Sequence, residues 1–368
     1  MDSYDIGRMD IEGQSGGRLF AKGAYGCIYH VPLLCKGKTH ETLEKNTEIR
    51  MGSTLSKLLS APDAKVEFDI AKRIQAIPLW KQYFLVAEGL CVPAPIKKQV
   101  NTEIEDCPIV QSHKGPLTEL RLLKLSYGGT PLEQYRMNFK KYPFIDFAKH
   151  LIEGLALLTL HGITHLDLHR GNILVDNSNI PRLIDFNLSI DRHDTHNLVN
   201  RLKHSYQLNL TQESPDFLLV NAIHIGKDGN WVISDMLTNK EMLKVLRKVL
   251  GSSEVEQREE ITEFYKESTI TQKGDLASWF NSYWSMNDSW AGGCILVKLI
   301  ANMSLWSTFE KGDFVLTKKK LIATIRRMCH MSPIKRFDAV QALAFLDPEN
   351  YIVRTYATEW LKKRPVTT

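Results

Sequence analysis

The chain has 368 residues, of which 43% are hydrophobic and 24% are charged. These proportions are typical of a folded globular protein and exclude a chain that is disordered throughout. A length of this order suggests roughly two or three structural units. Lysine and arginine outnumber aspartate and glutamate by 47 to 42, which gives a formal net charge of +5. This excess is too small to indicate nucleic-acid binding, although it suits a ligand that carries phosphates.

The pattern of apolar residues and cysteines predicts a cytoplasmic protein. The first residues are acidic and contain no apolar run, so we expect no secretory signal. The two most apolar stretches, residues 151–160 and 295–305, contain charge or glycine and fall short of a membrane span. The six cysteines show no CxxC spacing and are therefore expected to be reduced thiols, mostly buried, at positions 27, 35, 91, 107, 294 and 329.

The N-terminal part is predicted to be rich in β-structure. Residues 1–17 are polar and glycine-rich and are expected to form a flexible arm. The elements expected after the arm are two strands joined by a glycine-rich turn at 18–31, a strand at 54–59, a helix at 62–77 and a strand at 120–125. In that helix, Val66, Ile70 and Ile74 would form the apolar face.

The C-terminal part is predicted to be mostly helical. An apolar stripe runs from Phe144 to Leu158 and stops at Gly162, a residue that commonly ends a helix. Two short strands are expected next, at 173–175 and 182–184. We therefore predict an α+β fold with a small N-terminal lobe at 18–125 and a larger helical lobe at 126–368, hinged at Gly128 and Gly129.

Polar residues suited to phosphate chemistry gather around the two short strands. Asp167 and Asn172 lie in a loop after the apolar helix, and Asp185 follows the second strand. Carboxylate and carboxamide oxygens are the ligands that Mg²⁺ takes together with substrate phosphate. Upstream, the turn around Gly23 and Gly26 offers backbone N–H groups to phosphate oxygens. Phosphoryl transfer needs such a phosphate cover, a cation, metal ligands and a carboxylate beside the attacking hydroxyl.

At these motifs the chain resembles the eukaryotic-type protein-kinase superfamily, in order along nearly its whole length. The segment from Ala21 to Ile28 resembles the glycine-rich loop, His165 to Asn172 the catalytic loop, and Asp185-Phe186-Asn187 the metal-binding turn. The compact sequence that begins at Tyr25 and the long linker before Lys57 look more like those of kinases of large DNA viruses than those of cellular kinases. The resemblance implies a bilobal serine/threonine protein kinase that uses ATP and magnesium.

The resemblance also implies roles for particular residues. Its catalytic group would comprise Asp167, Lys57, Glu67 and His169, with Lys57 on the α/β-phosphates and Glu67 as the ion-pair partner of Lys57. Asn172 and Asp185 would bind the metal. The residues implied to bind the nucleotide are Gly23, Gly26, Ile28, Lys57, Leu123, Lys124, Leu125 and Leu174.

Three landmarks of the resemblance lie further along the chain. Asp216 would pair with Arg336, and Asp288 would stand at the start of a buried helix that anchors the larger lobe. The intervening stretch, about residues 217–287, is longer than the family needs and is expected to contain helices at 237–250 and 254–265. It would be a surface-packed elaboration or, alternatively, a docking surface for a protein partner.

Several residues have competing interpretations. His161, His165 and His169 recur at helical spacing, but Gly162 interrupts the helix, so we expect no zinc site and place His165 beneath the catalytic loop. The phosphate-binding lysine would be Lys57 because only this one lies in a strand-like run, in contrast to Lys36, Lys38 and Lys45. Asp69 is the alternative to Glu67.

Five positions depart from the family pattern. Ala21 replaces a glycine, Leu55 a small residue above the adenine, and Asn187 the glycine of the metal-binding turn. Leu166 replaces an arginine that in many kinases binds a phosphorylated loop, which favours activity without phosphorylation within 188–214. His169 stands where protein kinases usually have lysine, a substitution common in small-molecule kinases.

Three functions follow from these observations. The first is a protein kinase acting on Ser/Thr hydroxyls of protein substrates, with ATP and no nucleic-acid or membrane partner. The second is a kinase of small molecules such as aminoglycosides or sugars, which His169 favours and the Asp216–Arg336 pair opposes. The third is an ATP-binding pseudokinase scaffold. The location expected is the cytoplasm, and for a viral protein the host-cell cytoplasm and the virion.

Overall fold

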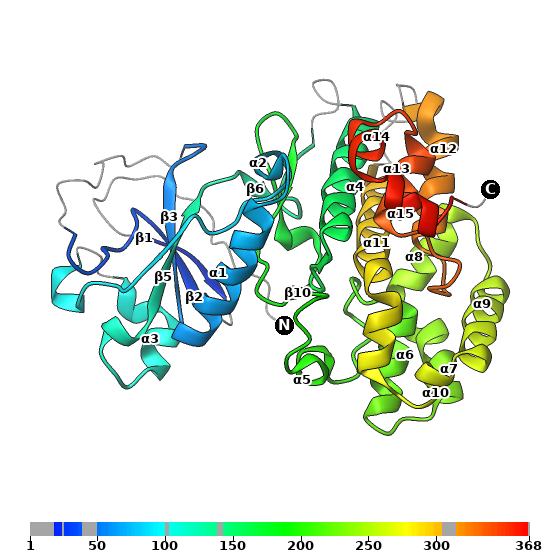
Figure 1. Ribbon diagram of the computed structural model, residues 1–368, viewed down its shortest axis with the longest axis horizontal. Coiled ribbons are helices and arrows are strands. Elements are labelled where there is room, and N and C mark those ends of the chain that lie inside the picture. The colour runs from blue at the N-terminus through cyan, green and yellow to red at the C-terminus, as the bar shows by residue number, and fades with distance from the viewer. Residues whose placement is uncertain are drawn as a thin grey trace. The chain divides into compact units, whose positions relative to one another are not determined.

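The computed structural model describes residues 18–23, 26–38, 50–99, 103–137, 143–303 and 314–366. The arm expected at 1–17 and the alternative Lys45 lie outside these residues. The chain forms two compact units (Figure 1). Unit 1 comprises Met1–Arg136, Gly171–Asn177 and Arg182–Asn187, and unit 2 comprises Met137–Arg170, Ser178–Pro181 and Leu188–Thr368. A single boundary was expected between residues 125 and 126. In the structure each unit instead consists of several separate segments of the chain.

Unit 1 is built on an antiparallel sheet with the strand order β1-β2-β3-β5-β4. The strands are β1 (Arg18–Gly23), β2 (Gly26–His30), β3 (Thr54–Leu59), β4 (Gly89–Cys91) and β5 (Arg121–Ser126). The sequence predicted four of these strands and missed β4, which is short and has no alternating pattern of its own. The β-structure expected for the N-terminal part is confirmed as a small antiparallel sheet.

The two faces of this sheet carry different chemistry. Cross-strand partners share a face, so Ile28, Lys57 and Leu123, which are in register on β2, β3 and β5, lie on the same side. Alternation along each strand puts the next residues on the other side. That other side joins a buried apolar cluster of Cys27, Tyr29, Leu33, Leu58, Ile104, Cys107, Leu117, Leu120 and Leu122.

Four cysteines of unit 1 form two disulfides, Cys27–Cys107 and Cys35–Cys91. The expectation of six reduced thiols is therefore wrong for these four and holds for Cys294 and Cys329, which are free and buried. The partners are 80 and 56 residues apart in the sequence, so spacing alone does not reveal them. The argument from cysteine usage to a cytoplasmic location loses its basis with this correction.

Reduction is expected to destabilise unit 1. Each disulfide closes a long loop, and its loss restores chain entropy to the unfolded state worth about 4 kcal/mol in the loop-closure model. Thermal unfolding of unit 1 should therefore occur at a lower temperature in the Cys27→Ser and Cys107→Ser variants than in Cys294→Ser. A thiol titration of the denatured, unreduced protein should find the two free cysteines only. Six titratable thiols would contradict the assignment.

Helix α1 (Ala61–Gln75) follows β3 directly and lies against the sheet in unit 1 (Figure 1). The Ser60 side chain caps it by accepting a hydrogen bond from the Asp63 N–H, and Pro62 suits the first turn. Its buried residues are Ala64, Glu67, Ile70, Ala71 and Ile74. Val66, expected on the buried face, is 44% exposed, because the helix turns Glu67 rather than Val66 toward the sheet.

The remaining strands of unit 1 form a second sheet of β6 (Thr130–Pro131), β8 (Ile173–Val175) and β9 (Pro181–Leu183), in the order β6-β8-β9. β8 matches the prediction, and β9 starts one position earlier than expected. Gly129 enters β6 with a φ of +121°, and a Cβ there would come within 2.2 Å of the Val175 carbonyl oxygen. Glycine is therefore required at this point for both conformation and space.

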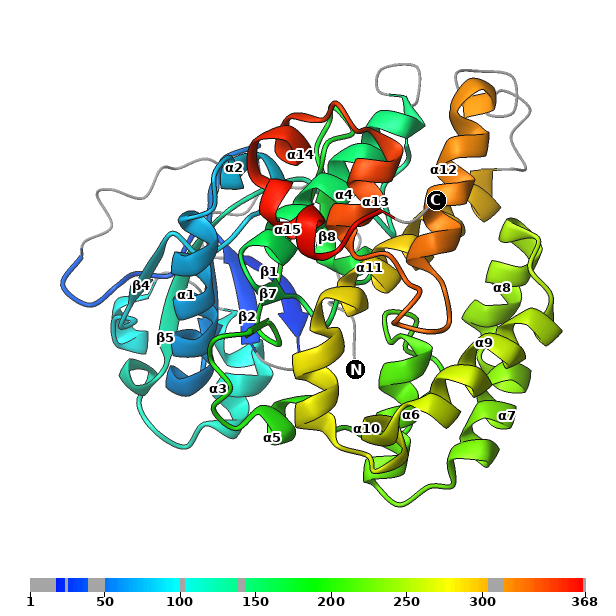
Figure 2. The same cartoon turned by 45° about the vertical axis from the view of Figure 1, so that its right-hand side comes forward.

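Unit 2 is helical. Its longer helices are α4 (Phe144–Leu160), α6 (Pro215–His224), α7 (Gly229–Asn239), α8 (Glu241–Leu250), α9 (Glu254–Glu267), α11 (Leu276–Met303), α12 (Phe314–Met328) and α13 (Ala339–Leu346). Helices α4 and α11 lie side by side, and α13 packs against α4 (Figure 2). The predicted apolar stripe of α4 is buried, and the helix ends before Gly162, whose φ is +74°. The helical character expected for this part is confirmed.

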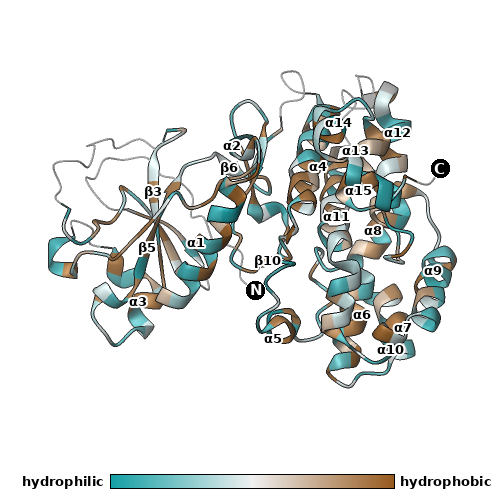
Figure 3. Cartoon of the chain, viewed as in Figure 1, coloured by the Kyte–Doolittle hydropathy of each residue, from teal (hydrophilic) through white to brown (hydrophobic). Residues whose placement is uncertain are grey.

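The region expected to be an insertion, 217–287, consists of helices packed on one another. The helix expected at 237–250 is two helices, because α7 ends at Asn239 and α8 begins at Glu241. Helix α8 packs on α11 with Met242, Leu243, Leu246 and Leu250 buried, whereas α9 is largely hydrophilic on its surface (Figure 3). This packing agrees with a surface elaboration, and docking of a partner there stays a prediction.

Unit 2 also contains short strands and helices. They are β7 (Ile163–Thr164), β10 (Ile190–Asp191), α5 (Leu198–Leu202), α10 (Thr269–Gln272), α14 (Tyr351–Tyr356) and α15 (Thr358–Lys363). β7 pairs with β10 in an antiparallel ladder. An apolar cluster joins the segment after β10 to α6 and α11, and contains Ile190, Leu198, Leu202, Phe217, Val220, Leu276, Trp279, Phe280 and Trp284.

The ion pair expected between Asp216 and Arg336 is present and buried. Arg336 Nη2 donates to Asp216 Oδ1 at 2.8 Å, and both side chains are 0% exposed. Trp279 Nε1 donates to the second oxygen of Asp216 at 3.0 Å. Arg336 also donates to the carbonyls of His330 and Met331. The pair thus joins the start of α6 to the chain ahead of α13.

Removing this pair is expected to be strongly destabilising. Arg336→Ala leaves a buried carboxylate without its cation, which typically costs 3–5 kcal/mol, so we expect a loss of about that size. The adjacent Lys335 pairs with Glu263 at 2.8 Å with more than half of each side chain exposed, and Lys335→Ala should cost less than about 1 kcal/mol. Denaturant unfolding of both variants measures the difference. Equal losses would show that burial of the Arg336 pair contributes nothing.

Among the helices that the structure describes, none combines the length and the apolar character needed to cross a membrane.

Candidate functional site

Lys57 lies between two carboxylates in unit 1. Its Nζ is 3.1 Å and 2.9 Å from the two Glu67 oxygens on α1 and 3.0 Å from Asp185 Oδ1, just after β9. The Lys57 side chain is 2% exposed, and those of Glu67 and Asp185 are 8% and 9% exposed. Residues separated by 10 and 128 positions in the sequence therefore meet at one buried ammonium. The predicted contact of Lys57 with Glu67 is confirmed.

The electrostatics of this cluster favour a further cation. Burial is the largest influence on Glu67 and raises its pKa; Lys57 opposes this, and the charge of Asp185 adds to it. One ammonium thus faces two carboxylates that repel each other. A divalent cation near Asp185 would relieve that repulsion. The alternative Asp69 makes only an exposed contact with Lys72, at 3.7 Å.

The backbone of unit 1 brings Asn172, one predicted metal ligand, beside the segment that leads to the other, Asp185. The Ile184 N–H donates to the Asn172 carbonyl at 3.0 Å, which puts Asn172 beside the chain that leads to Asp185. Asp185 has a φ of +61°, a conformation that non-glycine residues rarely adopt. Phe186 is buried, with its ring centroid 6.0 Å from that of Phe84. Within this turn the positive φ thus lies at Asp185.

The donor set at this point fits magnesium. Asn172 and Asp185 provide a carboxamide and a carboxylate, the hard oxygens that Mg²⁺ prefers when substrate phosphate completes its shell. In the part of the chain that the structure describes, no three histidine, cysteine, aspartate or glutamate side chains gather as a metal cage.

Gly23 at the end of β1 is in register with Gly26 at the start of β2, on either side of the predicted glycine-rich turn. A Cβ on Gly26 would lie 2.2 Å from the Leu58 carbonyl oxygen, so the close approach of β3 by itself requires glycine there. Ala24 and Tyr25 lie outside the described residues. The packing of β3 thus explains why residue 26 is glycine. The role of Gly26 in covering phosphates stays a prediction.

The predicted nucleotide-binding residues divide into two groups. Ile28, Leu123 and Leu125 share the face of the sheet that carries Lys57, and Leu125 is in register with Leu55. Lys124 is exposed on the opposite face, which separates it from that group. Leu174 lies on β8 in the second sheet, near Gly128: a Cβ on that glycine would be 3.3 Å from the Leu174 side chain.

Asp167 and His169 belong to unit 2. Asp167 Oδ1 accepts a hydrogen bond from Gln212 Nε2 at 3.0 Å, and His169 Nε2 is 3.9 Å from Asp167 Oδ2. The approach to this loop is strained, because Leu166 has a φ of +64°. Asp288 holds it: its two oxygens accept the N–H groups of His165 at 2.6 Å and Leu166 at 3.1 Å.

Gln212 is a functional candidate that sequence reasoning missed, and Asp288 was singled out only as a landmark of a helix. Asp288 was expected at the start of a buried helix, but it lies well inside α11, which begins at Leu276, and it acts on the loop before Asp167. Gln212 is separated from Asp167 by 45 positions, and no motif marks it. His165, expected beneath the catalytic loop, is fully buried.

Comparison with known proteins does not assign the chain to a family. No protein-family model matches the sequence, and no curated protein matches it either.

Proposed function

We propose that the chain is an ATP- and magnesium-dependent protein kinase that transfers the γ-phosphoryl group to Ser/Thr hydroxyls. The observation that carries the proposal is the burial of Lys57 between Glu67 and Asp185. Buried charge clusters are poor stabilisers, since well-packed apolar residues of similar volume often serve as well or better. Titratable groups clustered and perturbed in this way are more frequent at functional sites.

Each residue then has a distinct task. Glu67 orients the Lys57 ammonium, which would bind phosphate oxygens of the nucleotide as a fixed positive charge. Asn172 and Asp185 would hold magnesium, which when bound neutralises negative charge on the phosphates. Asp167 would accept the proton of the attacking hydroxyl, and Asp288 keeps the loop before it in its strained form.

Two observations bear on the substrate. The buried Asp216–Arg336 pair fixes the start of α6, directly after the segment that contacts Asp167, and this anchor favours a protein substrate. His169, close to Asp167, favours a small-molecule substrate instead. We give the first more weight because it supports a whole segment rather than one side chain.

Incubation with γ-labelled ATP and magnesium tests the proposal. The protein alone, and with generic basic and acidic proteins, should yield label on serine or threonine that mass spectrometry locates. Chelation of magnesium should stop transfer. Label on an aminoglycoside or sugar, with none on protein, would establish the second function. Thermal stabilisation by Mg-ATP without transfer to any acceptor would identify a pseudokinase and overturn the proposal.

A further inference from the structure

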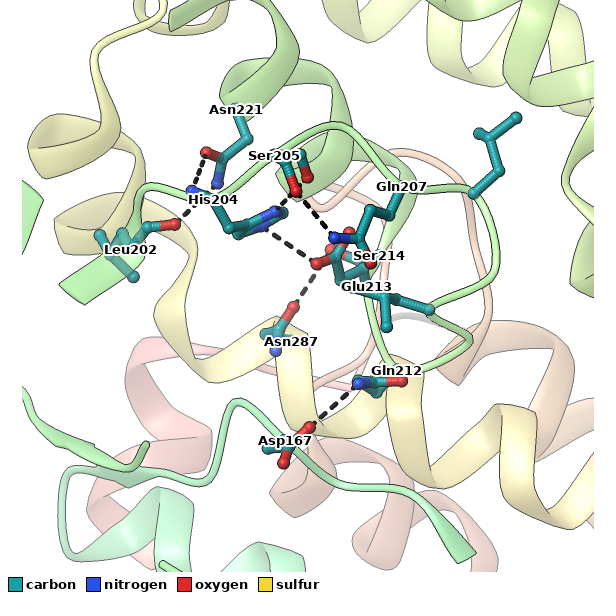
Figure 4. Close-up of polar contacts among 12 residues, drawn as sticks. Asp167, Leu202, His204, Ser205, Gln207, Gln212, Glu213, Ser214, Asn221 and Asn287 are labelled. Atoms are coloured by element: carbon teal, nitrogen blue, oxygen red, sulfur yellow. Dashed lines mark hydrogen bonds and ion pairs between the residues drawn. The ribbon is translucent and has the colours of Figure 1, made fainter. Parts of the chain in front are cut away.

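We propose that Gln212 is a positioning residue that orients the carboxylate of Asp167 for proton acceptance. This inference rests on the proposed function and names a residue that the motifs do not include. Gln212 Nε2 donates to Asp167 Oδ1 at 3.0 Å (Figure 4), and Gln212 is only 7% exposed. The contact joins two segments of unit 2 that are distant in the sequence.

The chemistry of this contact suits a carboxylate that must act as a base. A proton acceptor has to keep one oxygen toward the hydroxyl while its other oxygen is held in place. An amide donor holds Oδ1 without bringing a formal charge that would neutralise the carboxylate. His169 Nε2, at 3.9 Å from Oδ2, is beyond hydrogen-bond distance, so it does not restrain the carboxylate in the same way.

A buried lysine holds the segment that carries Gln212. Lys240, in the link between α7 and α8, is 0% exposed and donates to the carbonyls of Leu210 at 2.6 Å and Leu208 at 3.4 Å. Its charge also acts on Glu213, the residue after Gln212. Burying a charged lysine costs free energy unless it is hydrogen-bonded. Here its hydrogen bonds to the two carbonyls hold the backbone directly ahead of Gln212.

The segment that carries Gln212 runs from His204 to Glu213, and hydrogen bonds also hold its His204 end to the rest of unit 2. Asn221 on α6 accepts from the His204 N–H at 3.1 Å and donates to the Leu202 carbonyl at 2.9 Å (Figure 4). His204 Nε2 lies 3.0 Å from Glu213 Oε1, so the two ends of the segment face each other. The segment is therefore held by groups of the chain itself.

The test compares three variants in the phosphotransfer assay. Gln212→Ala removes the donor, Gln212→Glu keeps the size but replaces the donor with an acceptor, and Gln207→Ala is the control. Gln207 lies on the same segment and bonds to Ser205 Oγ instead of Asp167. Both Gln212 variants should lower kcat about ten- to a hundredfold, as loss of a hydrogen bond to a charged group does, with KM for ATP unchanged.

The pH profile separates positioning from a general loss of structure. A hydrogen bond to the ionised form lowers the pKa of a carboxyl, so the acid limb of the kcat profile should move to higher pH in Gln212→Ala. The titratable groups near Asp167 include His169 and Glu213. Burial raises the pKa of Glu213 to about 8, so its titration falls outside the acid limb.

The outcomes distinguish this inference from the function on which it rests. Reduced kcat with a shifted acid limb in both Gln212 variants, and neither change in Gln207→Ala, supports the inference. An active wild type with an unchanged Gln212→Ala overturns the inference alone. An equal loss in Gln207→Ala also overturns it, because the segment as a whole would then be responsible. A wild type without phosphotransfer overturns the proposed function and the inference together.

Discussion

Replacement of Lys57 by methionine is expected to abolish phosphotransfer and to destabilise unit 1 by about 3–5 kcal/mol. The substitution keeps the volume of the side chain but leaves Glu67 and Asp185 buried and facing each other without a cation. Activity should fall because no fixed positive charge remains for the phosphates, and stability because two like charges lose their common partner.

A double variant separates the two effects. Lys57→Met with Glu67→Gln removes the ammonium and one carboxylate together, so part of the lost stability should return while phosphotransfer stays absent. Lys72→Met on the exposed side of α1 is the matched control and should change neither property. Urea unfolding and the label-transfer assay measure both quantities. If Lys57→Met unfolded like the wild type, the cluster would not have the energetic character that its burial indicates.

Asp167→Asn is expected to lower kcat by about 10² to 10⁴ while leaving stability almost unchanged. The amide has the shape of the carboxylate, and the surrounding fold depends on Asp288 rather than on Asp167 for the position of the loop. The loss would reflect the absence of a proton acceptor near the hydroxyl. The rate should be measured under single-turnover conditions so that product release does not hide the chemical step.

Asp288→Asn provides the contrast to this result. It replaces a carboxylate that accepts two backbone N–H groups with an amide that has one oxygen, so Leu166 should lose its strained conformation. We expect Asp288→Asn to lose both stability and activity, whereas Asp167→Asn loses activity alone. Near wild-type turnover in Asp167→Asn would exclude this residue as the proton acceptor.

The sequence predicted those elements whose local pattern agrees with their surroundings. Strand β3 and its lysine were located correctly because a strand-like run precedes a helix. The apolar stripe of α4 was found for the same reason, whereas the Asp216–Arg336 pair was implied by the family resemblance. On α1 the periodicity placed Ile70 and Ile74 correctly on the buried face but misplaced Val66, because the sheet draws Glu67 inward to reach Lys57.

Contacts between distant segments without a motif could not be predicted. The disulfides join cysteines that no spacing rule pairs, and both bring loops onto the sheet from far along the chain. Gln212 reaches Asp167 through a segment whose position depends on a lysine beyond it in the sequence. Such residues are found only when tertiary packing is known, because their own composition resembles that of an ordinary surface loop.

The division of the chain has a consequence for how the protein could be dissected. Unit 1 ends its first stretch at Arg136 but regains Gly171–Asn177 and Arg182–Asn187 much later. A fragment that stops near residue 136 would keep Lys57 and Glu67 yet lack Asp185, so half of the counterions of the lysine would be missing. Neither unit is a continuous length of polypeptide, and a ribosome must extend the chain through residue 185, past the first segments of unit 2, before the lysine has its full set of partners.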